Sequence, residues 1–287
     1  MNGSRDLLVL HVEATRLTLD PQRGGTVRAF NWRGKDVLRP TPADAGDDPF
    51  DTASFPMVPF VNRVAHGRFT FGGHAVQLAR NWSGDPHPLH GKGWRLPWDV
   101  VTASPSRAVL RFEGGADEWP WRYRCEQCFQ VLRDGLSIEL SVENLSTAPM
   151  PAMLGLHPYF PEAPDAQLQA QLPRVWLTDH GALPVRETQT SAGWGFEPPR
   201  AINAVPLDHS FCGWNGLALL RWPDRSVTIR AMHCSCLHVY APATKDFFCI
   251  EPQTAAAGAL GRGGADVSVI APGQRLAIRV DFEVEEN

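Results

Sequence analysis

Short runs of strand-forming residues, separated by tight-turn residues, dominate this sequence. Arg68–Phe71 and His74–Leu78 flank Gly72-Gly73, and Asp134-Gly135 separates two further apolar runs in the same way. Both patterns are signals of two-residue β-hairpins. No stretch of 12 or more residues repeats its apolar side chains at helical spacing. The sequence therefore predicts an all-β protein, a large antiparallel sandwich or barrel.

The strand pattern extends over most of the chain. Further strands are expected at Arg16–Leu19, Val27–Trp32, Tyr123–Leu132, Leu136–Val142, Val227–Met232, Leu237–Tyr240 and Leu276–Val284. Pro40–Pro49 is a polar loop with strand-like sequence on both sides, so we expect it to connect strands. Gly181–Pro206 is expected to be irregular and held in place by Trp194 and Phe196. We therefore predict a single domain over residues 1–287, because β-sandwiches of about 200–250 residues commonly form one unit.

Charge and hydropathy exclude several classes of protein. The chain has 27 Lys and Arg against 31 Asp and Glu, a formal net charge of −4, with no basic run that indicates nucleic acid. It has no Lys- and Arg-rich amphipathic helix and no apolar run of membrane-spanning length, so no membrane partner is expected. The early apolar run Leu7–Leu10 is too short for a secretion signal. We expect a cytoplasmic location.

The six cysteines are expected to be free thiols of a reducing compartment. Cys125 and Cys128 form a CxxC inside a predicted strand, where a spacing of three places their side chains on opposite faces. Cys234 and Cys236 share a face, but no second pair stands at zinc-site spacing. The sequence therefore predicts buried or half-buried thiols, and no metal site.

Two loop clusters combine polar, reactive groups with proline and aromatic residues. In the first, Phe55–Arg63, two prolines stiffen an apolar segment that ends in Asn62 and Arg63. Arg63 is either a donor fork for ligand hydroxyls or a surface arginine at a strand start. The second cluster has His87 and His90 in a loop with prolines and glycines. These histidines are either ligand contacts or solvated loop residues, and no partner at a recognised spacing makes them metal ligands.

Three further clusters contain a titratable group beside apolar residues. His157 lies among apolar and aromatic neighbours, where burial lowers a histidine pKa and a nearby carboxylate raises it. Glu251 follows an apolar strand-like run, and desolvation there would make it a better base near pH 7. Asp208 precedes His209 and could bind a ligand hydroxyl. For each the structural alternative stays open: a core histidine, a strand-end glutamate and a turn aspartate.

Taken together and in this order, the clusters resemble the motifs of the aldose 1-epimerase (galactose mutarotase-like) family. The matching residues are Asn62-Arg63 with Gly67 and Phe69, Leu89-His90-Gly91, Gly155–Phe160, Leu207-Asp208 with Phe211, and Glu251-Pro252. With the flanking strands, the likeness extends over nearly the whole chain. It implies a large twisted antiparallel β-sandwich with the site on the concave face of one sheet.

The resemblance also implies a mechanism. Glu251 would be the general base that takes the proton of the anomeric hydroxyl, and His157 the general acid that protonates the ring oxygen. After ring opening and rotation about the C1–C2 bond, the aldehyde closes from either face. Substrate contacts are implied for Asn62, Arg63, His90 and Asp208. The partner is a small sugar, and neither a metal nor any other cofactor is expected.

Three other functions stay open on the sequence. A hexose-phosphate 1-epimerase would need an additional Arg/Lys cluster for the phosphate. A non-catalytic sugar-binding protein could share the fold, since fold does not determine function. A glycosidase needs two carboxylates across the bond, a pair that Asp208 and Glu251 could supply. The natural sugar, the anomeric preference and the oligomeric state are not predicted.

Overall fold

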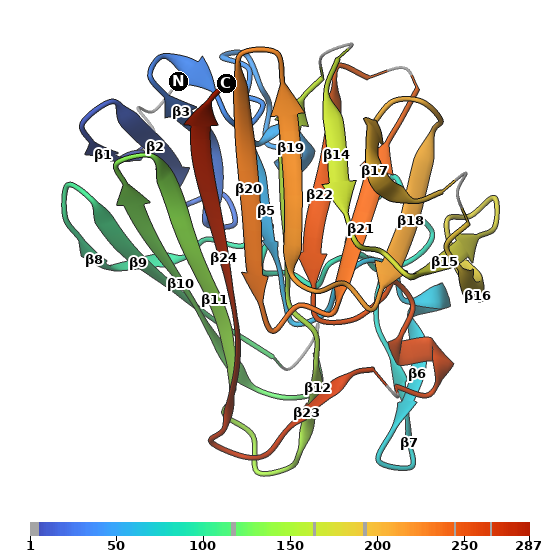
Figure 1. The fold of residues 1–287 in the computed structure, drawn as a ribbon. Coiled ribbons are helices and arrows are strands. Elements are labelled where there is room, and N and C mark those ends of the chain that lie inside the picture. Colours follow the sequence, from blue (N-terminus) through green and yellow to red (C-terminus); the bar gives the residue numbers. More distant parts are fainter. Residues whose placement is uncertain (1–5, 116–118, 163–164, 192–193, 244, 265) are drawn as a thin grey trace.

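Antiparallel strands in two large sheets make up the body of the molecule (Figure 1). The computed structural model describes residues 6–115, 119–162, 165–191, 194–243, 245–264 and 266–287. The first large sheet has the order β1 (Leu8–Val12), β2 (Thr15–Asp20), β3 (Thr26–Trp32), β5 (Ser54–Met57), β13 (Gly155–Pro161), β22 (Phe247–Gln253), β21 (Cys236–Ala241), β18 (Leu207–Cys212), β15 (Arg174–Thr178) and β16 (Pro184–Gln189), with β4 (Lys35–Asp36) beside β3. The second has the order β17 (Phe196–Ala201), β14 (Gln167–Ala170), β19 (Leu217–Trp222), β20 (Arg225–Met232), β24 (Arg275–Glu286), β11 (Gly135–Asn144), β10 (Tyr123–Leu132), β9 (Arg107–Gly114) and β8 (Asp99–Ala103).

Smaller elements complete the structure. Two-stranded sheets are formed by β6 (Arg68–Phe71) with β7 (His74–Gln77) and by β12 (Met150–Ala152) with β23 (Ser268–Ile270). Three short 3₁₀ helices are η1 (Pro49–Asp51), η2 (Ala65–Gly67) and η3 (Leu260–Arg262). No helix in the described part of the chain is long and apolar enough to cross a membrane. The predicted all-β class is confirmed.

The hydrophobic core lies between the two large sheets. Phe160 of β13 packs against Phe282 of β24 and Trp222 of β19, with ring centroids 6.4 and 6.2 Å apart. Because side chains alternate along a strand, the neighbours of Phe160 in β13 point to the opposite face of the first sheet. That outer face is therefore free for polar and reactive side chains.

All strands predicted from the sequence are present, with ends that differ by at most two residues. The β6–β7 hairpin turns at Gly72 and Gly73, whose φ angles of 57° and 81° belong to a type I′ turn. The second predicted hairpin also forms, but Leu132 pairs with Gly135, so its turn residues are Arg133-Asp134. The predicted loop after Pro40 is present and ends where η1 begins.

The expectation that Gly181–Pro206 is irregular was wrong. This segment contains β16 and β17, which form the edges of the first and second large sheets. Both strands contain proline, which has no backbone N–H to donate a hydrogen bond to a neighbouring strand and is therefore tolerated mainly at the edge of a sheet. The predicted anchors are in place, since Phe196 is buried and Trp194 packs against the core.

The expectation of six free thiols was also wrong. Cys212 of β18 and Cys236 of β21 face each other across the strand pair and form a disulfide. The strand order that brings them together could not be inferred from their separation in sequence. Cys125 and Cys128 are free and, as predicted, differ in exposure because they lie on opposite faces of β10.

Candidate active site

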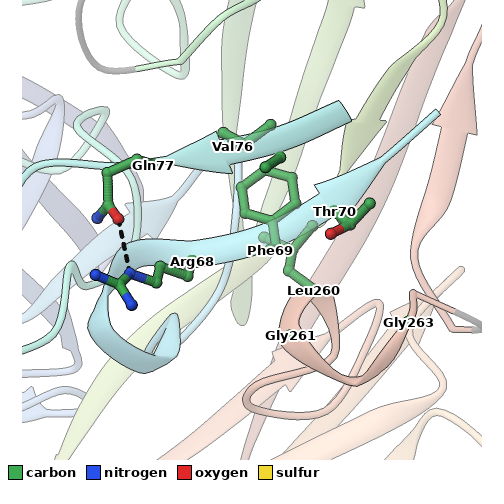
Figure 2. A pocket seen from close by; sticks show the side chains of 9 residues that line it. Arg68, Phe69, Thr70, Val76, Gln77, Leu260, Gly261 and Gly263 are labelled. Atoms are coloured by element: carbon green, nitrogen blue, oxygen red, sulfur yellow. Dashed lines mark hydrogen bonds between the residues drawn. The ribbon is translucent and has the colours of Figure 1, made fainter. Parts of the chain in front are cut away.

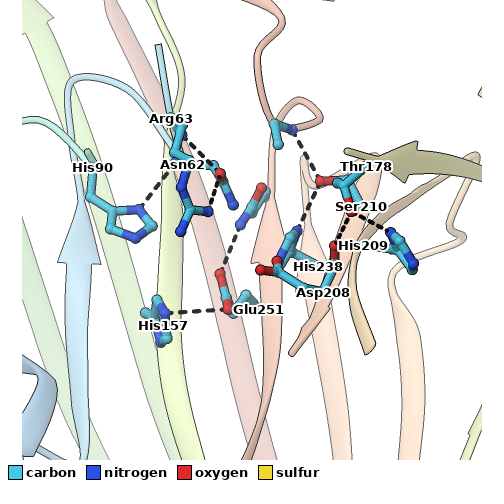
Figure 3. A network of polar contacts seen from close by, with 12 residues as sticks. Asn62, Arg63, His90, His157, Thr178, Asp208, His209, Ser210, His238 and Glu251 are labelled. Carbon is cyan, nitrogen blue, oxygen red and sulfur yellow. Dashed lines mark hydrogen bonds and ion pairs between the residues drawn. The ribbon is translucent and has the colours of Figure 1, made fainter. Parts of the chain in front are cut away.

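Four neighbouring strands of the first sheet place titratable side chains on its outer face. In sheet order they are β13 with His157, β22 with Glu251, β21 with His238 and β18 with Asp208. The alternate residues of the same strands belong to the core. These four side chains line a cavity of about 490 Å³ (Figure 3). The fold thus brings together residues, such as His157 and Glu251, that are far apart in sequence.

His157 and Glu251 form a buried pair at the floor of the cavity. His157 Nε2 lies 3.3 Å from Glu251 Oε1, and Gln253 Nε2 donates to Glu251 Oε2 at 3.0 Å. The His157 ring stacks on Tyr159 and packs against Phe55, with centroids 4.7 and 4.4 Å apart. The aromatic rings fix the imidazole plane, and the glutamine fixes the carboxylate.

Burial shifts the two pKa values in opposite directions. It raises the pKa of Glu251 to about 7, although the charge of His238 opposes the rise. It lowers the pKa of His157 to about 3, and the charge of His238 lowers it further. The sequence left the balance at His157 undecided, and in the structure desolvation outweighs the opposing charge of Asp208. Near pH 7 the pair therefore holds at most one proton, mainly on Glu251.

Asn62 and His90 hold each other at the cavity wall. The Asn62 N–H donates to His90 Nδ1 at 3.0 Å, and the His90 N–H donates to the Asn62 carbonyl at 3.1 Å. Both residues have positive φ, 54° and 57°, which is uncommon outside glycine. Next to them, Gly91 is required, because a Cβ there would lie 2.1 Å from the Val58 carbonyl oxygen. The two loops are thus locked together around the site.

The acceptor role of His90 Nδ1 determines its tautomer. Burial, together with the charges of His157 and Arg63, lowers the pKa of His90 well below its ordinary value. A neutral ring that accepts at Nδ1 carries its hydrogen on Nε2. His90 lines the cavity, whereas His87 does not; His87 Nδ1 accepts the His66 N–H at 3.1 Å. Of the two loop histidines singled out in the sequence, only His90 is part of the site.

Arg63 is positioned by the second loop. Its Nε donates to Asp85 Oδ2 at 2.7 Å, and Asn62 Oδ1 accepts from its backbone N–H at 2.8 Å. The Arg63 side chain is about one-fifth exposed and lines the cavity. An arginine oriented by a carboxylate retains donors for ligand oxygens.

Asp208 is held by His238, a residue that sequence reasoning missed. His238 Nε2 lies 3.0 Å from Asp208 Oδ1, and His238 Nδ1 lies 2.9 Å from Ser210 Oγ (Figure 3). Burial alone would raise the pKa of Asp208, but the hydrogen bond and charge of His238 lower it overall. Burial alone would lower the pKa of His238, but Glu251 and Asp208 raise it overall. The sequence feature that could have identified His238 is the presence of a histidine within the apolar strand Leu237–Tyr240.

The rest of the cavity wall combines aromatic rings with charges of both signs. Arg39 stacks over Tyr159 and Phe247 and donates to two backbone carbonyls. Among the described lining residues, the cations are Arg39, Arg63 and Lys245, and the acids are Asp48, Asp51, Asp208, Asp246 and Glu251. Acidic side chains thus outnumber basic ones. The sequence did not indicate Arg39, which comes from a separate segment, whereas Tyr159 belongs to the Gly155–Phe160 motif.

One group near the cavity floor has the composition of a metal site. His157, Cys249 and Glu251 each present a ligand atom, and these atoms lie within 4.8 Å of one another. Cys249 and Glu251 are two residues apart on β22 and so share a face. Sequence spacing did not reveal this set, because His157 comes from another strand. Burial raises the pKa of the Cys249 thiol well above its ordinary value, which disfavours the thiolate that binds metal.

A second depression, of about 560 Å³, lies between the β6–β7 hairpin and the segment around Leu260 (Figure 2). Arg68 is the one ionisable side chain among its described lining residues, and its Nε donates to Gln77. The depression therefore offers no acid–base pair. The cavity around His157 and Glu251 is the candidate active site.

Comparison with known proteins identifies the family of the chain. Residues 12–283 match the family model for aldose 1-epimerase. The chain is 32% identical to the uncharacterized protein YphB of Escherichia coli K12 over 275 residues, 92% of this chain and 93% of that one.

Solved structures give the same result. A structure from Escherichia coli K12, described as that of a candidate aldose 1-epimerase, has a TM-score of 0.91 and 30% identity, covering 98% of this chain and 99% of that one. The structure of a galactose 1-epimerase from Lactobacillus acidophilus has a TM-score of 0.81 and 17% identity, covering 98% of this chain and 94% of that one. At this identity the comparison shows a similar fold. The predicted galactose mutarotase-like sandwich is thereby confirmed, and the chain belongs to the aldose 1-epimerase family.

Proposed function

We propose that the protein is a mutarotase, which interconverts the α and β anomers of a free aldose. The observation that carries the proposal is the His157–Glu251 pair, 3.3 Å apart and facing a cavity of about 490 Å³. Ring opening needs one proton removed from the anomeric hydroxyl and one delivered to the ring oxygen. One base and one acid are sufficient for this exchange.

In the proposed reaction Glu251 takes the proton from O1 and His157 gives a proton to O5. The O1–H electron pair forms the aldehyde as the C1–O5 bond breaks, and the freed O5 becomes a hydroxyl. Rotation about C1–C2 then presents the other face of the aldehyde. On closure the roles reverse, His157 taking the O5 proton and Glu251 returning one to O1, so protons and electrons balance over the cycle.

The pair starts this cycle with one shared proton. In the empty cavity that proton lies mainly on Glu251, since the pKa of Glu251 is about 7 and that of His157 about 3. Transfer of the proton from Glu251 to His157 leaves the total charge unchanged and gives the carboxylate and imidazolium that the reaction needs. The productive carboxylate–imidazolium form therefore has the same number of protons as the form that prevails in the empty cavity, in which Glu251 is protonated. The apparent pKa values of such a system belong to the pair and not to either residue.

The other site residues have binding roles in this proposal. His90, with its hydrogen on Nε2, and the donor fork of Arg63 bind sugar oxygens, and Asn62 keeps both in place. Asp208 accepts from hydroxyls remote from C1. Arg39 donates to two backbone carbonyls and Arg63 to Asp85, so the described lining residues include no dedicated cation cluster for a phosphate. The lack of such a cluster among these residues is the reason to prefer free aldoses to hexose phosphates.

Anomer exchange measured by NMR tests the proposal directly. Freshly dissolved single anomers of free hexoses, pentoses and hexose phosphates are compared with and without the protein. We expect faster exchange for at least one free aldose and little effect on the phosphates. Binding without faster exchange at any pH would identify a sugar-binding protein instead. Acceleration confined to phosphates would favour the hexose-phosphate 1-epimerase.

A further inference from the structure

His238 is buried at the centre of the site and has two fixed partners. Its Nε2 lies 3.0 Å from Asp208 Oδ1, and its Nδ1 lies 2.9 Å from Ser210 Oγ. Ser210 Oγ also accepts the Ala257 N–H at 3.0 Å. An ionised carboxylate only accepts hydrogen bonds, so His238 Nε2 must carry the hydrogen. The imidazole is therefore fixed in orientation and donates to Asp208.

The strand register places the same residue beside Glu251. His238 pairs with Ser210 on β18 and with Glu251 on β22. Directly paired residues of neighbouring strands have Cβ atoms about 5 Å apart on the same face. His238 is therefore the residue that connects the substrate-binding Asp208 to the proposed base.

On this geometry, and resting on the proposed function, we propose that His238 is a positioning residue. Its Nε2–H orients Asp208 toward the substrate, and its charge sets the pH range over which the Glu251–His157 pair works. His238 itself does not touch the reacting atoms.

The charge of His238 depends on the groups around it. The titratable and charged groups that act on it are Asp208 and His209 on β18, Glu251 on β22, His157 on β13, and Arg63 and His90 from the loops. The two carboxylates favour the imidazolium, and together they outweigh burial, so the pKa of His238 is raised. A positive charge beside Glu251 favours its carboxylate. Loss of that charge must therefore move the titration of Glu251 to higher pH.

Three variants separate the two parts of the proposal. His238→Gln keeps an N–H donor for Asp208 but has no charge, and His238→Leu has neither. His209→Gln is the matched control: His209 is adjacent to Asp208, but its ring bonds Thr178 and does not line the cavity. The readouts are kcat and KM for anomer exchange against pH, and the ¹³C carboxyl titration of Glu251 without substrate.

We expect His238→Gln to keep KM within about threefold, while the Glu251 titration and the basic limb of kcat move up by about one pH unit. We expect His238→Leu to show the same upward movement and to raise KM about tenfold, the loss of about 1.4 kcal/mol. His209→Gln should match the wild type in both. An unchanged Glu251 titration in His238→Gln, or an unchanged KM in folded His238→Leu, overturns the proposal.

The design separates this proposal from the proposed function. If the wild-type protein accelerates anomer exchange of no aldose, the proposed function has failed. The Glu251 titration needs no turnover and still decides whether His238 acts on the base. If His238→Leu does not fold, His238→Gln still decides whether the charge acts on Glu251, and His238→Met, which has a long side chain but no N–H donor, decides the effect on KM.

Discussion

The Nε2 atom of His157 lies 3.3 Å from Oε1 of Glu251, in surroundings that leave the two residues with one proton near neutral pH. Neither side chain would have this protonation behaviour in water; it comes from their burial. Burial brings the pKa of the carboxyl into the physiological range and takes that of the imidazole out of it. In the proposed reaction the pair is thus prepared to take a proton from O1 and to deliver one to O5, the two oxygens bonded to C1.

The rate of anomer exchange should follow a bell-shaped pH profile. The singly protonated pair is the active form, so the rate falls as pH rises through about 7, where that proton is lost. It falls again in acid, as a second proton binds. His157→Asn should lose the basic limb and most of the rate, yet keep sugar affinity within about tenfold. Loss of binding with intact turnover of bound sugar would instead make His157 a ligand contact.

Glu251→Gln should abolish most of the anomer exchange. The amide keeps the size and can still bond Gln253, but it cannot accept the O1 proton. Loss of a general base typically lowers the rate about 10²–10⁴-fold. Exchange is measured by NMR, and sugar binding, which should stay measurable, by calorimetry. Turnover near that of the wild type would remove Glu251 from the mechanism.

The same substitution should stabilise the protein at high pH. The pKa of Glu251 rises from 4.5 to about 7 on folding, so its contribution favours the folded state below pH 4.5 and is lost as pH rises to 7. Relative to Glu251→Gln, the wild type should lose about 3 kcal/mol of unfolding free energy over that interval. Urea unfolding at pH 4 and pH 8 measures this difference.

The exposed Glu285 of β24 provides the control for that measurement. Glu285→Gln makes the same chemical change outside the core, so any general effect of removing a carboxylate appears there too. A stability difference between wild type and Glu251→Gln that is the same at both pH values would contradict the buried carboxylate.

The sequence predicted the fold class and nine of the strands that the structure describes, because strand signals are local. Alternation and turn residues identify β10 and the Gly72-Gly73 hairpin without any knowledge of their partners. The edge strands β16 and β17 were missed because their prolines are acceptable only at a sheet edge, and edges are a property of the whole topology. The Cys212–Cys236 disulfide was missed because the pairing of β18 with β21 is likewise a property of the whole topology.

The candidate site was predicted to a similar extent. Residues that belong to local motifs, such as His157 and Glu251, could be identified from their neighbours, and the structure brings them together. His238 and Arg39 have unremarkable neighbours in sequence, and only strand order and loop folding bring them into the cavity. The pKa directions likewise depend on burial, which no local pattern specifies.

The activity should not depend on a metal ion, although His157, Cys249 and Glu251 present three ligand atoms within 4.8 Å. A metal there would occupy the lone pairs that the proposed acid and base need, and it would have to displace the proton that burial keeps on the Cys249 thiol. Prolonged EDTA treatment should therefore leave the exchange rate within about twofold, because acid–base chemistry uses the side chains alone. Cys249→Ala should behave like the wild type before and after chelation. An activity lost on chelation and restored by one divalent ion in the wild type, but not in Cys249→Ala, would locate a required metal at these three residues and replace the acid–base account.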